Sequence, residues 1–158
     1  MLSSLSFNFT LRRYIKGKIG KFQNRAVLIC ASSDGDGDVK HDSIAAALSE
    51  LFDEECADSE SVLFDDDPSS AALASDVAAT LGWDAPSLTN RMDALQAAGV
   101  TIMFATSPFI HSVVERTLQM DEGRGARFSL SYGGITVIDF SGGVESATIA
   151  CINHTAHL

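Results

Sequence analysis

Short apolar runs alternate along the chain with longer stretches whose apolar residues recur at helical spacing. Apolar runs of strand length occupy residues 25–31, 61–64 and 100–105. Helical spacing is found over residues 42–52, 69–81, 86–98 and 109–120. Two further apolar runs, residues 134–140 and 146–152, flank Ser141-Gly142-Gly143, which is a hairpin signature.

The order of these elements, β-α-β-α-α-β-α-β-β, indicates the fold class. Alternation of strands and helices is typical of a mostly parallel sheet flanked by helices. The last two strands add an antiparallel hairpin at the C-terminal end. We therefore predict an α/β fold with a mostly parallel sheet, flanking helices and a C-terminal antiparallel hairpin.

The composition agrees with one soluble globular domain. The chain has 158 residues, of which 46% are hydrophobic and 20% charged. Such values are ordinary for a domain that buries a sizeable core. Its three cysteines form no C-x-x-C pair, and Cys30 and Cys151 lie in apolar, strand-like runs. We expect buried free thiols rather than a disulfide or a metal site, which fits a reducing compartment.

Charge divides the chain into a basic arm and an acidic body. The first 33 residues carry six basic and no acidic side chains, whereas the rest carry five basic and 21 acidic ones. Residues 1–24 are rich in serine and basic residues, a composition that resembles a mitochondrial transit peptide. We expect residues 1–24 to be an uncleaved targeting or docking segment, with a solvated tail as the alternative. Residues 25–158 form the body.

The basic side chains of the arm are the candidate docking residues. They are Arg12, Arg13, Lys16, Lys18 and Lys21. Such a cluster suits an acidic protein partner, an anionic lipid surface or RNA. The acidic body repels phosphates, so we expect no nucleic-acid surface there.

Small polar residues stand where two of the predicted strands end. Residues 31–34 are Ala-Ser-Ser-Asp, and residues 106–108 are Thr-Ser-Pro. Ligand sites of open α/β sheets form beyond the carboxyl ends of the strands. Neither end has a histidine, an arginine or a lysine. Ser107 before Pro108 instead predicts a helix N-cap, with proline at the first helical position.

Four blocks of the chain resemble one family. The clearest is GITVIDFSGGVESATIACINHTAHL (residues 134–158), which matches a strand, a glycine turn, a second strand and an L-N-D-T-A-H-L ending. RAVLICASSDG (residues 25–35) resembles a first strand with an R-H-G-E motif. Residues 62–82 resemble S-P-L-x-R-A-x-x-T-A, and residues 100–118 resemble a strand, a V-S-H-G motif and a helix. Taken in their order along the chain, the four blocks resemble the histidine phosphatase superfamily. This resemblance implies a phosphoglycerate mutase-like fold over residues 25–158.

Members of that superfamily use one histidine as phosphoryl acceptor, while a second histidine and two arginines bind the phosphate. The matched positions here are Ser32 for the acceptor, Ser107 for the second histidine, and Ala71 (Ser70 in a shifted register) for one arginine. A serine needs an adjacent base, and a phosphate dianion needs positive charge. The resemblance therefore implies a degenerate member, a pseudoenzyme with no catalytic residue.

We expect no metal or cofactor. Aspartate alternates with glycine over residues 34–38 as in a calcium loop, but the glycine and glutamate that such a loop requires are not in register. We expect a solvated acidic turn there, and no histidine pair has zinc spacing. His157 is expected to be structural, and His111 to be a partly exposed helix residue.

The function expected from these features is that of a non-catalytic structural or accessory subunit. The transit-like arm favours a mitochondrial assembly of protein subunits, with a respiratory complex or ATP synthase ranked ahead of the mitochondrial ribosome. Two alternatives stay open. One is a ligand-binding module that uses the remnant pocket, and the other is a hydrolase with altered chemistry through Ser32, Ser107 or His111.

Overall fold

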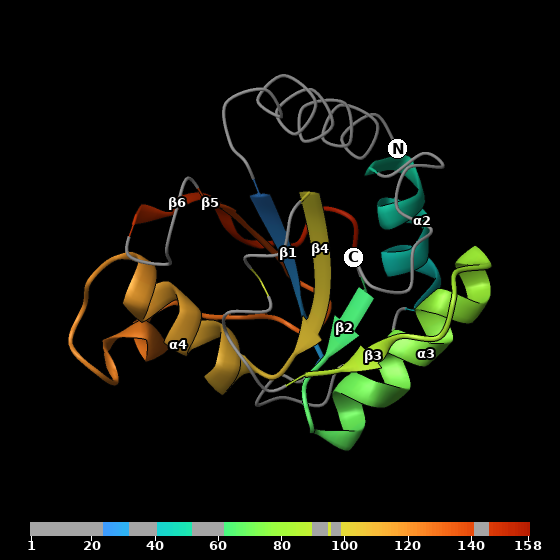
Figure 1. Cartoon of the computed structure of the whole chain (residues 1–158), viewed down its shortest axis with the longest axis horizontal. Helices are drawn as coiled ribbons and strands as arrows, with labels where there is room; N and C mark the ends of the chain where they lie inside the picture. Colours follow the sequence, from blue (N-terminus) through green and yellow to red (C-terminus); the bar gives the residue numbers. More distant parts are fainter. Residues whose placement is uncertain (1–23, 32–40, 52–61, 90–94, 96–98, 141–145) are drawn as a thin grey trace.

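The computed structural model describes residues 24–31, 41–51, 62–89, 95, 99–140 and 146–158 (Figure 1). Several predictions fall outside these residues: the arm up to residue 23 with its candidate docking side chains, Ser32, the acidic turn at 34–38 and the hairpin turn at 141–143. Asn24, the last residue of the predicted arm, is the first residue of a strand.

A six-stranded sheet forms the centre of the fold, with strand order β3-β2-β4-β1-β5-β6. The strands are β1 Asn24–Cys30, β2 Val62–Phe64, β3 Ser87–Leu88, β4 Gly99–Ala105, β5 Ile135–Phe140 and β6 Thr148–His154. Strands β1 to β4 run parallel, β5 is antiparallel to β1, and β6 is antiparallel to β5. The predicted mostly parallel sheet with a C-terminal antiparallel pair is confirmed.

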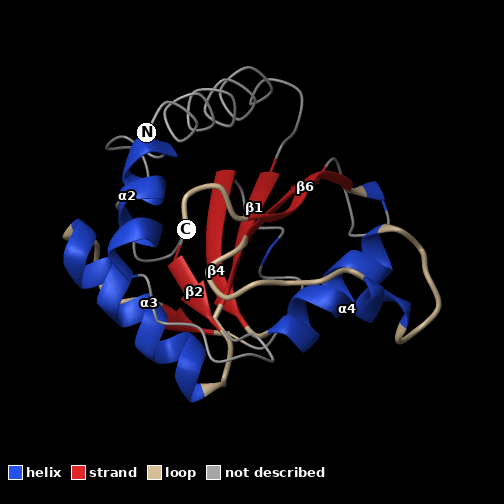
Figure 2. Cartoon of the chain, turned by 180° about the vertical axis from the view of Figure 1, so that it is seen from behind, coloured by secondary structure: helices blue, strands red, loops and turns tan. Residues whose placement is uncertain are grey.

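Helices cover both faces of the sheet (Figure 1, Figure 2). Helices α2 His41–Leu51 and α3 Pro68–Leu81 lie on one face, and α4 Ser107–Thr117 lies on the other with the short 3-10 helix η3 Arg124–Arg127. No helix among the described residues is long and apolar enough to cross a membrane.

The central strand β1 is buried on both faces. Val27 and Ile29 pack in the core beneath α2 and α3, whereas Leu28 and Cys30 pack in the core beneath α4. A strand covered on both sides has no polar face to present to solvent. This explains why residues 26–31 are continuously apolar rather than alternating.

Strong local signals begin and end α3. The N-cap residue Asp67 accepts a hydrogen bond from the Ser69 N–H at 2.8 Å, and Pro68 occupies the first helical position. Gly82 closes the helix in the left-handed conformation, with φ of 69°. Since Asp67 follows β2 by three residues, α3 starts at the end of the sheet where the parallel strands finish.

The predicted helix over residues 86–98 is wrong at its start. Ser87 and Leu88 form the edge strand β3, which pairs with Leu63 and Phe64 of β2. The Thr89 N–H extends this pairing by donating to the Phe64 carbonyl at 2.9 Å. The open edge of β2 provides backbone hydrogen-bond partners for residues 87–89. The helical spacing of the sequence does not reveal these partners. Residues 90–94 and 96–98 lie outside the described residues.

Candidate functional site

The parallel strands β1, β2 and β4 finish side by side, and five residues at their ends define what we call the carboxyl edge: Cys30, Ala31, Asp65, Thr106 and Ser107. Backbone hydrogen bonds hold these ends in line. The Ala31 N–H donates to the Ala105 carbonyl at 2.8 Å, and the Asp65 N–H donates to the Phe104 carbonyl at 3.1 Å. The carboxyl edge is therefore where this fold offers a ligand site.

Ser107 lies at the carboxyl edge, but not as the predicted N-cap. Thr106 is the N-cap residue of α4, so Ser107 is the first helical residue and Pro108 the second. The Ser107 side chain is only 7% exposed. Its Oγ lies 3.3 Å from Cys30 Sγ, a contact in which either atom can donate. The serine hydroxyl therefore contacts the end of β1.

A buried carboxylate joins the ends of β2 and β4. Asp65 is 4% exposed. Its Oδ2 accepts hydrogen bonds from the Thr106 N–H at 2.8 Å and from the Thr106 hydroxyl at 3.0 Å. Its Oδ1 accepts from the Asp67 N–H at 3.3 Å. The sequence alone did not single out Asp65, although its position directly after a predicted strand was a usable signal.

The position matched to the family arginine lies in the first turn of α3. Ala71 is partly exposed there, and its N–H donates to the Asp67 carbonyl at 3.1 Å. Ser70, the alternative register, is fully buried, and its Oγ has no hydrogen-bond partner within the described part of the chain. Neither residue carries charge. The other sequence-predicted position, Ser32, lies outside the described residues.

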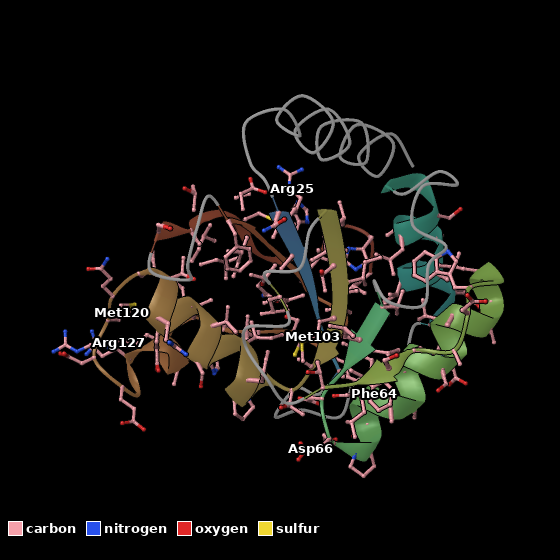
Figure 3. All side chains as sticks on the ribbon, in the orientation of Figure 1. Arg25, Phe64, Asp66, Met103, Met120 and Arg127 are labelled. Atoms are coloured by element: carbon pink, nitrogen blue, oxygen red, sulfur yellow. The ribbon has the colours of Figure 1, made fainter. Side chains whose placement is uncertain are left out.

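Basic side chains of the described residues lie away from the carboxyl edge. They are Arg25, Arg116, Arg124 and Arg127. Arg25 is at the amino-terminal end of β1, whereas Asp66 lies at the opposite end of the sheet (Figure 3). Arg116 is in the last turn of α4, and the remaining two are in η3. Within the described ranges, no three His, Cys, Asp or Glu side chains converge as metal ligands.

Two histidines, His111 and His157, make structural contacts. His111 Nε2 lies 2.7 Å from the Phe128 carbonyl, so α4 holds the chain that follows η3. His157 Nε2 lies 2.8 Å from the Gly133 carbonyl, while its Nδ1 is buried without a partner among the described residues. Burial lowers the pKa of His157, and the hydrogen bond to Gly133 opposes part of that shift. Burial also lowers the pKa of His154, with a further contribution from His157.

Solved structures with the same fold include two named enzymes. A mutant phosphoserine phosphatase from Entamoeba histolytica, in complex with phosphoserine, aligns with a TM-score of 0.59 and 12% identity over 85% of this chain and 99% of its own. A phosphoglycerate mutase from Plasmodium falciparum aligns with a TM-score of 0.55 and 15% identity over 84% and 93%. The product of an open reading frame of Mycobacterium tuberculosis aligns with a TM-score of 0.57 and 13% identity over 85% and 99%.

These similarities define the architecture of the chain. It has the phosphoglycerate mutase-like fold, as the resemblance of its sequence blocks implied. No protein-family model matches the sequence, and no curated protein matches it significantly.

Proposed function

We propose that this chain is a non-catalytic, phosphatase-like structural or accessory subunit of a larger mitochondrial assembly. The observation that carries the proposal is the chemistry of the carboxyl edge. The Asp65 carboxylate lies there and accepts three hydrogen bonds. Ser107 and Ala71 occupy the positions matched to the second histidine and to one arginine of the family.

Phosphoryl transfer needs a nucleophile with a base beside it and cations that balance the phosphate charge. The Ser107 hydroxyl lies 3.3 Å from Sγ of the buried Cys30. Asp65 adds negative charge where a phosphate dianion carries its own. At a separation of 4 Å and an effective dielectric constant of 20, each pair of unit charges repels by about 4 kcal/mol. These features support a scaffold rather than a phosphatase.

Activity measurements test the non-catalytic half of the proposal. We expect no hydrolysis of p-nitrophenyl phosphate or phosphoserine above the level of a buffer blank. The variants Ser32→Ala and Ser107→Ala serve as the controls for contamination. Hydrolysis that purifies with the wild-type chain and disappears in either variant refutes the proposal in favour of an enzyme with altered chemistry.

The subunit half of the proposal rests on charge. A basic arm joined to an acidic body suits a chain that is anchored by its arm in an assembly of other protein subunits, with anionic lipid as a second contact. A respiratory complex or ATP synthase ranks ahead of the mitochondrial ribosome, because the acidic body repels RNA phosphates.

Native gels of detergent-solubilised mitochondria test this half. We expect the added wild-type chain to migrate with a high-mass complex, and a variant with Arg12, Arg13, Lys16, Lys18 and Lys21 changed to Gln to migrate as the free chain. Because the protein is added after the mitochondria are solubilised, its import into mitochondria does not affect the result. The matched control changes Arg124 and Arg127, two exposed arginines of η3, to Gln. Migration of the wild type as the free chain, or equal loss in the control, contradicts docking by the arm.

A further inference from the structure

We propose that Asp65 is an internal anion that occupies the N-terminus of α4 and closes the carboxyl edge to anionic ligands. The inference concerns binding and stability, so it does not depend on whether the chain is catalytic. It rests on where Asp65 is anchored, on what its carboxylate binds and on how deeply it is buried.

The backbone of Asp65 is fixed by the sheet. Asp65 directly follows Phe64, which lies opposite Phe104 in the parallel pairing of β2 and β4. The Asp65 N–H donates to the Phe104 carbonyl and so extends that pairing by one step. The side chain therefore starts from a rigid position beside the end of β4.

The carboxylate binds the N-cap residue of α4 from outside the helix. Thr106, the N-cap residue, makes no side-chain capping bond of its own; its hydroxyl and its N–H both donate to Asp65 Oδ2. The first turn of α4, within Ser107–Thr117, contains no acidic residue. A helix N-terminus carries partial positive charge and unpaired N–H groups, and it favours a negative group. Asp65 supplies that group across 41 residues of sequence.

A bound anion at this edge would need the same donors. Phosphates and carboxylates bind helix N-termini through backbone N–H groups and nearby hydroxyls. Asp65 already holds the Thr106 N–H and hydroxyl. It is only 4% exposed, so it cannot turn away into solvent without breaking its three hydrogen bonds. An anion that approaches therefore meets both occupied donors and a like charge.

Removing the carboxylate should turn the closed edge into an anion site. We compare wild type, Asp65→Ala and Asp65→Asn by thermal unfolding in chloride, formate and phosphate at equal ionic strength. Asp66→Ala is the matched control, because Asp66 is an exposed neighbour and its loss changes the net charge equally. In chloride we expect Asp65→Ala to unfold about 3–8 °C below wild type, whereas Asp66→Ala stays close to wild type.

Formate and phosphate should restore part of the loss in Asp65→Ala, with a gain that rises with the logarithm of anion concentration. Wild type and Asp66→Ala should show no such gain. Asp65→Asn should be less stable than wild type yet insensitive to anions, because the carboxamide still fills the space. Three results overturn the proposal: an unchanged unfolding temperature for Asp65→Asn, no anion effect on Asp65→Ala, or an equal effect on Asp66→Ala. If Asp65→Ala does not fold in chloride, its refolding in formate is the readout, and failure to refold there also overturns it.

Discussion

A buried ion pair at the opposite end of the sheet offers the sharpest test of how this fold is held together. Arg25 of β1 lies directly opposite Asp139 of β5 in the antiparallel register. Arg25 Nη2 donates to Asp139 Oδ2 at 2.9 Å, and Arg25 Nε donates to Oδ1 of the same carboxylate. The two side chains are 4% and 1% exposed. The pair is thus bidentate and removed from water.

Removing either residue leaves a buried charge without its ion-pair partner. We expect Arg25→Met or Asp139→Leu to lower the free energy of unfolding by about 3–5 kcal/mol. That loss is a large share of the stability of about 5–15 kcal/mol usual for a domain. The double variant Arg25→Met/Asp139→Leu buries no charge, so it should be much more stable than the sum of the single losses predicts.

Urea unfolding followed by circular dichroism gives the four free energies of this double-mutant cycle. The exposed pair Arg124–Asp121 is the matched control, since its charged atoms are 3.4 Å apart but its side chains are 58% and 83% exposed. Arg124→Met should change stability by no more than about 1 kcal/mol. If Arg25→Met costs no more than Arg124→Met, or if the double variant equals the sum of the singles, the reasoning from burial is refuted.

Two further predictions concern the C-terminal part of the chain. Burial lowers the pKa of His157 in the folded chain below the ordinary 6.5. Below pH 6.5 the unfolded chain therefore binds a proton that the folded chain does not. As a result, the stability falls as the pH falls, until the lowered pKa is reached. His157→Gln should flatten this loss in urea midpoints measured between pH 7.5 and 5, and an unchanged slope would assign the loss to other groups, His154 first. Gly134→Ala places a methyl group 2.2 Å from Asn153 Oδ1, so it should cost about 1–3 kcal/mol. Gly82→Ala is the comparison, because its methyl group meets no atom within 4 Å and carries only the strain of a φ of +69°. If Gly82→Ala lowers the unfolding temperature more than Gly134→Ala does, the predicted clash at Gly134 is contradicted.

Much of the fold was predictable because local and global preferences agree. The apolar run that forms β1 is too short for a helix, and the sheet covers it on both faces. Asp67, Pro68 and Gly82 each favour a helix boundary by their own chemistry, and α3 begins and ends there. Elements of this kind need no knowledge of the rest of the molecule.

The parts that sequence reasoning missed depend on partners far away in the chain. Ser87 and Leu88 join the sheet because β2 leaves an edge open beside them. Ser107 looked like an N-cap because a proline follows it, yet Thr106 takes that position and Asp65 binds its backbone. Arg25 was counted in the basic charge of the first 33 residues, although Asp139, 114 residues away, pairs with it. Charge counted along a sequence cannot separate exposed from paired groups.

Under our proposal that the chain has no phosphate site, these contacts also explain how its fold stays stable. A pocket that binds anions gathers donors and positive charge, and those groups are unsatisfied when the ligand is absent. At the carboxyl edge Asp65 supplies a permanent acceptor for the Thr106 donors, and Ser107 Oγ and Cys30 Sγ share a hydrogen bond. Once donors are satisfied internally, the sheet ends no longer need a ligand to be stable. Under our proposal, the Asp65 carboxylate that stabilises the scaffold also opposes an anionic ligand, so absence of phosphate binding and stability of the fold are expected together.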